Sequence, residues 1–160
     1  FAYGSNMSLA RLRERAPDAW PIGCFTLSGH ALRFHKVGTD GSGKCDAFLT
    51  NNPSDCVVGV LFELDENEKK YLDQVEGLGL GYEQKAVIVV DAFGNEVSAT
   101  TYYAIEIDAT LKPYSWYKNH VLLGSKESSL PETYIQEINA VESVEDPDKK
   151  RETEQRAIHS

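Results

Sequence analysis

The hydrophobic positions of this chain recur with a period of two over much of its length, which is typical of β-strands. The alternation predicts strands over residues 25–34, 47–50, 56–64, 82–91 and 96–105. We interpret the first as one strand whose change of phase marks a β-bulge. Phe93-Gly94-Asn95 predicts a hairpin between the last two strands. Phe1-Ala2-Tyr3 is interpreted as a further strand tip.

Helical spacing of apolar residues predicts helices over residues 9–16, 65–76, 115–123 and 131–141. We expect Asn6 or Ser8 to cap the first helix and Gly77 to end the second. Strands and helices do not alternate regularly, which favours an α+β fold with a small mixed or antiparallel sheet curled towards a barrel. We assign residues 1–141 to a single domain. The charged stretch 142–160 is predicted to be a C-terminal tail, either loosely held or dependent on packing.

The composition is acidic, with 25 Asp and Glu residues against 16 Lys and Arg residues and a formal net charge of −9. Such a surface repels phosphate groups, so nucleic acids and anionic membranes are poor candidate partners. No apolar run is long enough to span a bilayer. The three cysteines suggest no disulfide framework and there is no signal-peptide pattern, so we expect a cytoplasmic location.

Metal and nucleophile motifs are missing from the sequence. The four histidines and three cysteines have no ligand-like spacing, and Ser5 does not lie in a GxSxG motif. The glycine-rich stretch 77–81 follows a helix, whereas a dinucleotide-binding loop follows a strand. We therefore expect neither a metal nor an organic cofactor.

Two local features could carry chemistry. At Tyr3-Gly4-Ser5-Asn6 a strand turns into a helix, which would direct backbone N–H groups towards an anion; the alternative is a simple turn with a cap. Glu76 ends an amphipathic helix, where the helix dipole disfavours a charged carboxylate and suits it to general acid–base work. The alternative interpretation is that Glu76 is an ordinary surface glutamate near a helix C-cap.

Three segments follow one another along the chain: FAYGSNM, then LDQVEG with GYEQKAV, then PYSWYKNHVLLGSKESSLPETYIQEI. Together they resemble the γ-glutamylcyclotransferase family, also described as AIG2-like, and the last segment resembles its γ-glutamyl-amino-acid branch. The resemblance covers roughly Phe1 to Val141. It implies a small mixed β-barrel flanked by helices and an enzyme that cyclises a γ-glutamyl group to 5-oxoproline and releases an amine or amino acid.

The resemblance also implies the residues of the site. Glu76 matches the catalytic glutamate of the family. The substrate-binding positions are Tyr3, Gly4, Ser5, Asn6, Tyr82 and Tyr117. No cofactor or metal is implied, and the partner is a small γ-glutamyl substrate, bound by a monomer or homodimer. The spacing from Glu76 to Tyr82 is one residue shorter than in animal members of the family.

Four alternatives stay open at this point. The glutathione-specific branch of the family would have another variant of the first motif. A γ-glutamylamine-specific cyclotransferase would run the same chemistry, although Ser5-Asn6 and Leu130-Pro131 depart from that branch. A binding module would hold a γ-glutamyl ligand without turnover, although an anionic ligand would not favour Glu76. A small interaction domain would have no ligand and a filled apolar barrel. The sequence does not identify the leaving amine.

Overall fold

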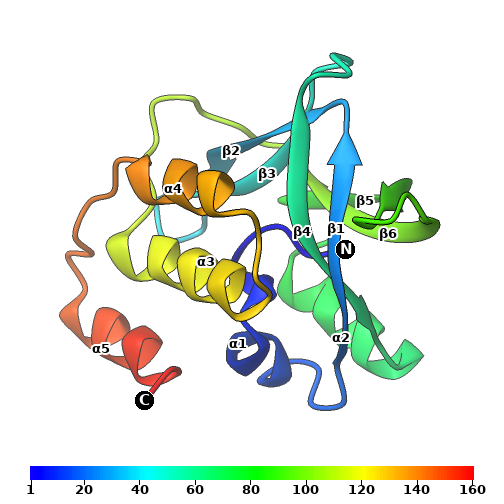
Figure 1. Cartoon of the computed structure of the whole chain (residues 1–160). Helices are drawn as coiled ribbons and strands as arrows, with labels where there is room; N and C mark the ends of the chain where they lie inside the picture. Colours follow the sequence, from blue (N-terminus) through cyan, green and yellow to red (C-terminus); the bar gives the residue numbers. More distant parts are fainter.

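The computed structural model describes residues 1–160 as an α+β fold, as predicted. Figure 1 shows the strands on one side and α3, α4 and α5 on the other. The strands are β1 (Trp20–Ser28), β2 (His30–Val37), β3 (Gly43–Leu49), β4 (Cys56–Glu63), β5 (Tyr82–Val90) and β6 (Glu96–Ala104). The helices are the 3-10 turn η1 (Ser5–Met7), α1 (Leu9–Arg13), α2 (Glu66–Val75), α3 (Ser115–Glu127), α4 (Glu132–Ala140) and α5 (Lys149–Ala157).

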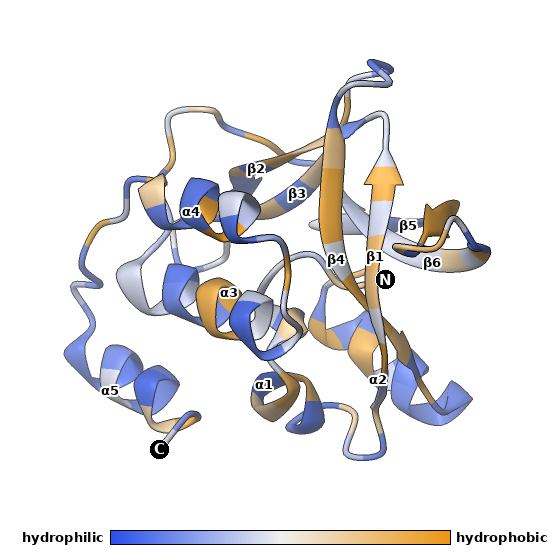
Figure 2. Ribbon diagram, viewed as in Figure 1, coloured by the Kyte–Doolittle hydropathy of each residue, from blue (hydrophilic) through white to orange (hydrophobic).

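The strands form two antiparallel sheets. One has the order β4-β1-β5-β6, and the other consists of β2 and β3. The strongly apolar β1 and β4 pair along their whole length, and Figure 2 shows them as the most hydrophobic strands of this view. Val57, Val60 and Val89 of the larger sheet and Val121 of α3 are fully buried together, so the main core lies between this sheet and α3.

The predicted single strand over residues 25–34 is wrong. Gly29 has φ +74°, a left-handed conformation that ends β1 and turns the chain into β2. β1 then pairs with β4, whereas β2 pairs with β3 in the other sheet. The change of hydrophobic phase therefore marks a corner between two sheets.

The other predicted helices and strands are present with shifted ends, but the predicted strand tip at residues 1–3 is only a single β-bridge between Ala2 and Val60. Ser8 caps α1, because its side chain accepts a hydrogen bond from the Arg11 N–H, and Asp65 caps α2 in the same way. β5 and β6 form the predicted hairpin. β3 begins at Gly43, four residues before its predicted start at residue 47, and α3 extends four residues beyond its predicted end at Leu123. Pro131 is the N-cap of α4 and not its first helical residue.

Residues 142–160 contain α5, which the hydrophobic pattern does not predict. The segment is fixed by polar contacts: the fully buried Asp146 accepts hydrogen bonds from Arg151 and from the indole of Trp116. No residue of α5 itself is buried, in keeping with its hydrophilic colouring in Figure 2. None of the helices is long and apolar enough to cross a membrane.

Candidate active site

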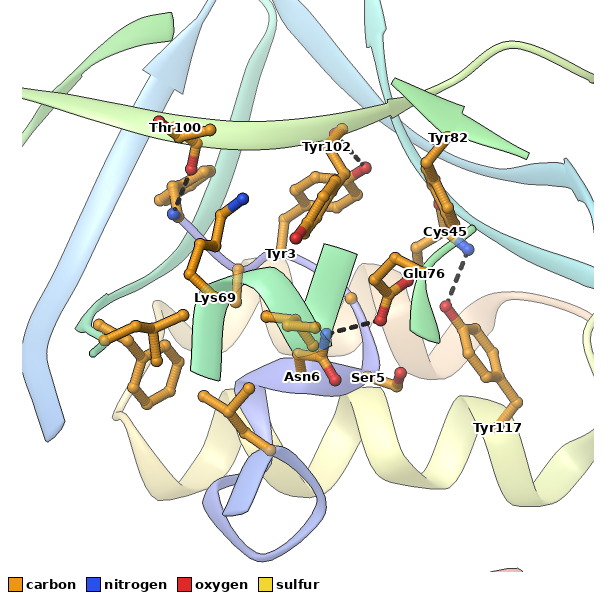
Figure 3. A pocket seen from close by; sticks show the side chains of 17 residues that line it. Tyr3, Ser5, Asn6, Cys45, Lys69, Glu76, Tyr82, Thr100, Tyr102 and Tyr117 are labelled. Carbon is orange, nitrogen blue, oxygen red and sulfur yellow. Dashed lines mark hydrogen bonds between the residues drawn. The ribbon is translucent and has the colours of Figure 1, made fainter. Parts of the chain in front are cut away.

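A pocket opens where the N-terminal loop meets the end of α2. Its walls come from residues 1–6, from α2, from β5 and β6, and from α3 (Figure 3). Eleven of the 17 lining residues are hydrophobic, and the polar remainder includes Ser5, Asn6 and Glu76. The pocket is thus an apolar recess with a few polar groups, the usual form of a small-molecule site.

The loop at Gly4-Ser5-Asn6 is packed from both sides. A Cβ on Gly4 would lie 2.9 Å from the Cβ of Cys45, and a Cβ on Gly124 would lie 2.4 Å from the Ser8 nitrogen. Glycine at both positions lets β3 and α3 approach the loop backbone. The N–H groups of Gly4, Ser5 and Asn6 donate to no backbone carbonyl. They are therefore available to a ligand.

Glu76 faces this loop from the C-cap position of α2. One of its carboxylate oxygens accepts a hydrogen bond of 3.0 Å from the Asn6 side-chain nitrogen (Figure 3). The Asn6 side-chain oxygen in turn accepts a hydrogen bond of 3.0 Å from Arg15. Because Arg15 can only donate, it fixes which end of the Asn6 amide faces Glu76. The second carboxylate oxygen of Glu76 forms no hydrogen bond within the chain.

Three buried tyrosines surround the carboxylate. The Tyr117 hydroxyl oxygen accepts a hydrogen bond of 2.9 Å from the Cys45 N–H, and the Tyr82 hydroxyl donates one of 2.6 Å to the Cys45 carbonyl. The Tyr3 hydroxyl donates to the Tyr102 carbonyl at 2.7 Å. Burial raises the pKa of Tyr3, Tyr82 and Tyr117 well above the usual value, so all three stay protonated. Of the three, only the Tyr117 hydroxyl donates to no backbone carbonyl.

Cys45 lies in the same pocket but is unsuited to nucleophilic attack. Its thiol is 1% exposed, and burial raises the pKa of this thiol to about 12. A neutral thiol is a poor nucleophile at neutral pH. Nowhere in the chain do three or more His, Cys, Asp or Glu residues gather as a metal site.

All seven site residues predicted from the sequence line this one pocket. The sequence reasoning missed Arg11 and Arg15, which contact Ser5 and Asn6 respectively. These two arginines are four residues apart, directly after the loop, and this helical spacing was a usable signal. Lys36 and Lys44 were also missed, because β2 and β3 bring them to the site from distant parts of the chain.

The fold and the pocket define an α+β protein with a small-molecule site built around one carboxylate. Residues 56–138 match the AIG2-like family. The chain belongs to this family.

Relatives and solved structures agree with this family. The chain is 28% identical to human gamma-glutamylcyclotransferase over an alignment of 172 positions. The alignment covers 96% of this chain and 89% of the relative. It is 29% identical to the bovine protein of the same name over 89% of this chain and 77% of the relative. Among solved structures, a gamma-glutamyl cyclotransferase superposes with a TM-score of 0.87 and 25% identity, covering 98% of this chain and 96% of its own. A human protein described as uncharacterized superposes with a TM-score of 0.88 and 26% identity, covering 100% and 96%.

Proposed function

We propose that this chain is a γ-glutamylcyclotransferase. The α-amine of a γ-glutamyl substrate attacks its own γ-carbonyl carbon, a C–N bond closes the five-membered ring of 5-oxoproline, and the amide C–N bond to the leaving amine breaks. Curated relatives that carry this name over most of the chain support the proposal. Intramolecular attack has a high effective molarity, so the protein mainly has to fold the substrate into the reactive conformation.

Glu76 is the proposed general acid–base. Near neutral pH the substrate amine is an ammonium and cannot attack, so the Glu76 carboxylate removes one proton and later gives a proton to the departing nitrogen. The observation that carries this role is the contact with Asn6, which holds one oxygen of Glu76 while the other has no hydrogen-bond partner in the chain. A binding module for an anionic ligand would gain nothing from this carboxylate.

The loop and Tyr117 are the proposed binding groups. The free N–H groups of Gly4, Ser5 and Asn6 suit either the α-carboxylate of the substrate or the oxyanion that forms at the γ-carbonyl. The Tyr117 hydroxyl, which donates to no backbone carbonyl, supplies one more donor. Tyr3 and Tyr82 shape the walls, because their hydroxyl hydrogens are already donated to backbone carbonyls.

Several expectations accompany the proposal as predictions. The two sheets are expected to close into a small barrel, and β3 and β6 already approach through the Ala104 N–H, which donates to the Asp46 carboxylate at 2.8 Å. The cytoplasmic location, the monomeric or homodimeric state, the lack of a cofactor and the domain boundary at residue 141 also stay predictions.

The test is a direct search for the product. Purified protein is incubated with γ-Glu-Ala, with the ε-lysine isopeptide of glutamate and with glutathione, and 5-oxoproline is measured by mass spectrometry. We expect product from γ-Glu-Ala, its near-complete loss in Glu76→Gln, and full activity in the control Glu66→Gln, an exposed glutamate on the same helix. No product from any substrate would reject the proposed activity, and full activity in Glu76→Gln would reject the assigned base.

A further inference from the structure

A second, more polar cavity adjoins the pocket and shares Ser5, Glu76, Tyr82 and Tyr117 with it. Five cationic side chains line this cavity against three carboxylates, although the chain as a whole carries a net charge of −9. The cations are Arg11, Arg15, Lys36, Lys44 and Arg151, and the carboxylates are Asp40, Glu76 and Glu106. We call this cavity the cationic basin.

Two of these cations already have carboxylate partners. Lys44 pairs with Asp40 at 2.8 Å and Arg151 pairs with Asp146 at 2.6 Å. Arg11 and Arg15 hydrogen-bond only to uncharged oxygens of neighbouring side chains. Lys36 is therefore the one cation of the basin that has neither a hydrogen-bond partner nor an ion-pair partner.

Lys36 is a buried lysine without a bonding partner. It is 8% exposed, yet its ammonium forms no hydrogen bond and no ion pair within 4.0 Å. Its Nζ lies 4.6 Å from the centroid of the Tyr82 ring. Burial lowers the pKa of Lys36, and the carboxylates of Glu76, Asp40 and Glu106, which lie beyond ion-pair distance, offset this only in part. A buried charge normally has a partner, since removing it from water is costly. The free ammonium at the basin wall therefore indicates a binding position for an anion.

The backbone around Glu76 leaves room for this ammonium. A Cβ on Gly81 would lie 2.7 Å from the Lys36 Nζ and 2.8 Å from its Cε. Gly81 belongs to the short connector between Glu76 and Tyr82, so the tip of Lys36 rests against the segment that carries the proposed base. The ammonium is thus held by β2 on one side and by this connector on the other.

We propose that Lys36 binds a carboxylate on the leaving group of the substrate, and so selects amino acids over uncharged amines as leaving groups. This inference rests on the proposed function. The pocket on the loop side already offers the free N–H groups of residues 4–6 to the glutamyl portion, and Lys36 does not line it. A substrate anchored there with its reacting amide beside Glu76 extends past Tyr82 and Tyr117 into the cationic basin, where Lys36 meets its far end.

The test compares two substrates that differ only in this carboxylate. γ-Glu-Ala carries it, and γ-glutamyl-ethylamide has a hydrogen in its place. A hydrogen bond between charged groups predicts that Lys36→Met lowers kcat/KM for γ-Glu-Ala by roughly 10- to 150-fold. The value for γ-glutamyl-ethylamide should stay within about twofold of the unmodified protein on the same reasoning. The control Lys126→Met, at an exposed position near the end of α3, should change neither value.

A second variant keeps the charge and moves it. In Gly81→Ala the new methyl group displaces only the flexible tip of Lys36, so the protein should fold and lose activity on γ-Glu-Ala alone. If Lys36→Met does not fold, Gly81→Ala alone tests whether Lys36 binds the leaving-group carboxylate. Equal losses on both substrates would overturn the proposal, because Lys36 would then act on the glutamyl portion or on Glu76 and not on the leaving group. An unchanged kcat/KM on γ-Glu-Ala would overturn it by leaving Lys36 without a role.

The proposed function can fail separately. If the unmodified protein forms no 5-oxoproline from either compound, calorimetric titration with the same two compounds replaces the kinetic assay. Tighter binding of γ-Glu-Ala that disappears in Lys36→Met would then still support the carboxylate subsite. Equal binding of the two compounds would overturn it.

Discussion

Arg15 is linked to the proposed base by hydrogen bonds through Asn6, and this arrangement gives a quantitative prediction. Arg15 donates to the Asn6 side-chain oxygen at 3.0 Å, and the Asn6 nitrogen donates to Glu76 at 3.0 Å. A hydrogen bond to an ionised group contributes about 1.5–3 kcal/mol, so Asn6→Leu should lower kcat/KM by roughly 10- to 150-fold. Arg15→Met removes the group that orients the amide, together with one positive charge of the cationic basin, and a loss of about 1 kcal/mol, or roughly fivefold, is expected.

The two substitutions should not be additive. Once Asn6 is absent, Arg15 has nothing to orient, so the double variant should be no slower than Asn6→Leu alone. The assay is a double-mutant cycle on γ-Glu-Ala with kcat and KM measured separately, and the loss in Arg15→Met should fall mainly on kcat. Arg13→Met is the matched control, since the Arg13 guanidinium contacts the Ala19 carbonyl away from the pocket.

If the loss in kcat/KM of the double variant equals the product of the two single losses, Arg15 does not act through Asn6. Arg15 would then make an independent contact with the substrate. A loss confined to KM in Arg15→Met would indicate the same. Equal stability of all variants in thermal denaturation is the required control, because Arg15 is only partly buried and its removal leaves no cavity in the core.

Three further predictions concern the loop, the thiols and the C-terminal segment. Gly4→Val should raise KM for γ-Glu-Ala at least about tenfold, because its side chain would collide with Cys45 and move the loop; an unchanged KM would contradict the anion-binding role of the loop. Iodoacetamide at pH 8 should modify the exposed Cys56 and spare Cys45, whose thiol has a pKa of about 12, as peptide mass mapping would reveal. Asp146→Ala should destabilise the protein by about 3 kcal/mol at pH 7, measured by chemical denaturation. Because Arg151 holds the pKa of Asp146 below its usual 3.8, the pair stabilises the fold above that pH and its contribution is lost as the pH falls further, so the difference between variant and parent should shrink in acid.

Local sequence patterns were sufficient to predict the helices and strands that bury one face against the core. β4, β5 and β6 alternate or are continuously apolar, and α2 has a capping Asp65 and a helical repeat, so their positions follow from the sequence. The corner at Gly29 was missed because alternation alone does not reveal that two adjacent strands join different sheets. α5 was missed because it buries no residue, and its position depends on the contact between Asp146 and Arg151.

The same contrast applies to the site. Glu76 and the Gly4-Ser5-Asn6 loop could be found because each has a short, recognisable sequence around it. Lys36 has no such sequence: an isolated lysine in an alternating strand looks like an ordinary exposed residue. Only the packing of β2 against the connector at Gly81 makes it a buried and unpaired cation.

The C-terminal segment also holds part of the candidate site in place. The Gln155 side-chain oxygen, on α5, accepts a hydrogen bond of 2.7 Å from Arg11, and Arg11 in turn donates to the Ser5 hydroxyl oxygen at 3.1 Å. The same Gln155 oxygen lies 3.1 Å from His120, whose pKa burial lowers to about 3, so this ring is neutral at pH 7 and can donate through one nitrogen. With its oxygen occupied by Arg11, the Ser5 hydroxyl is oriented to donate its hydrogen to a ligand. A segment with the composition of a solvated tail therefore contributes to the geometry of the substrate loop at the opposite end of the chain.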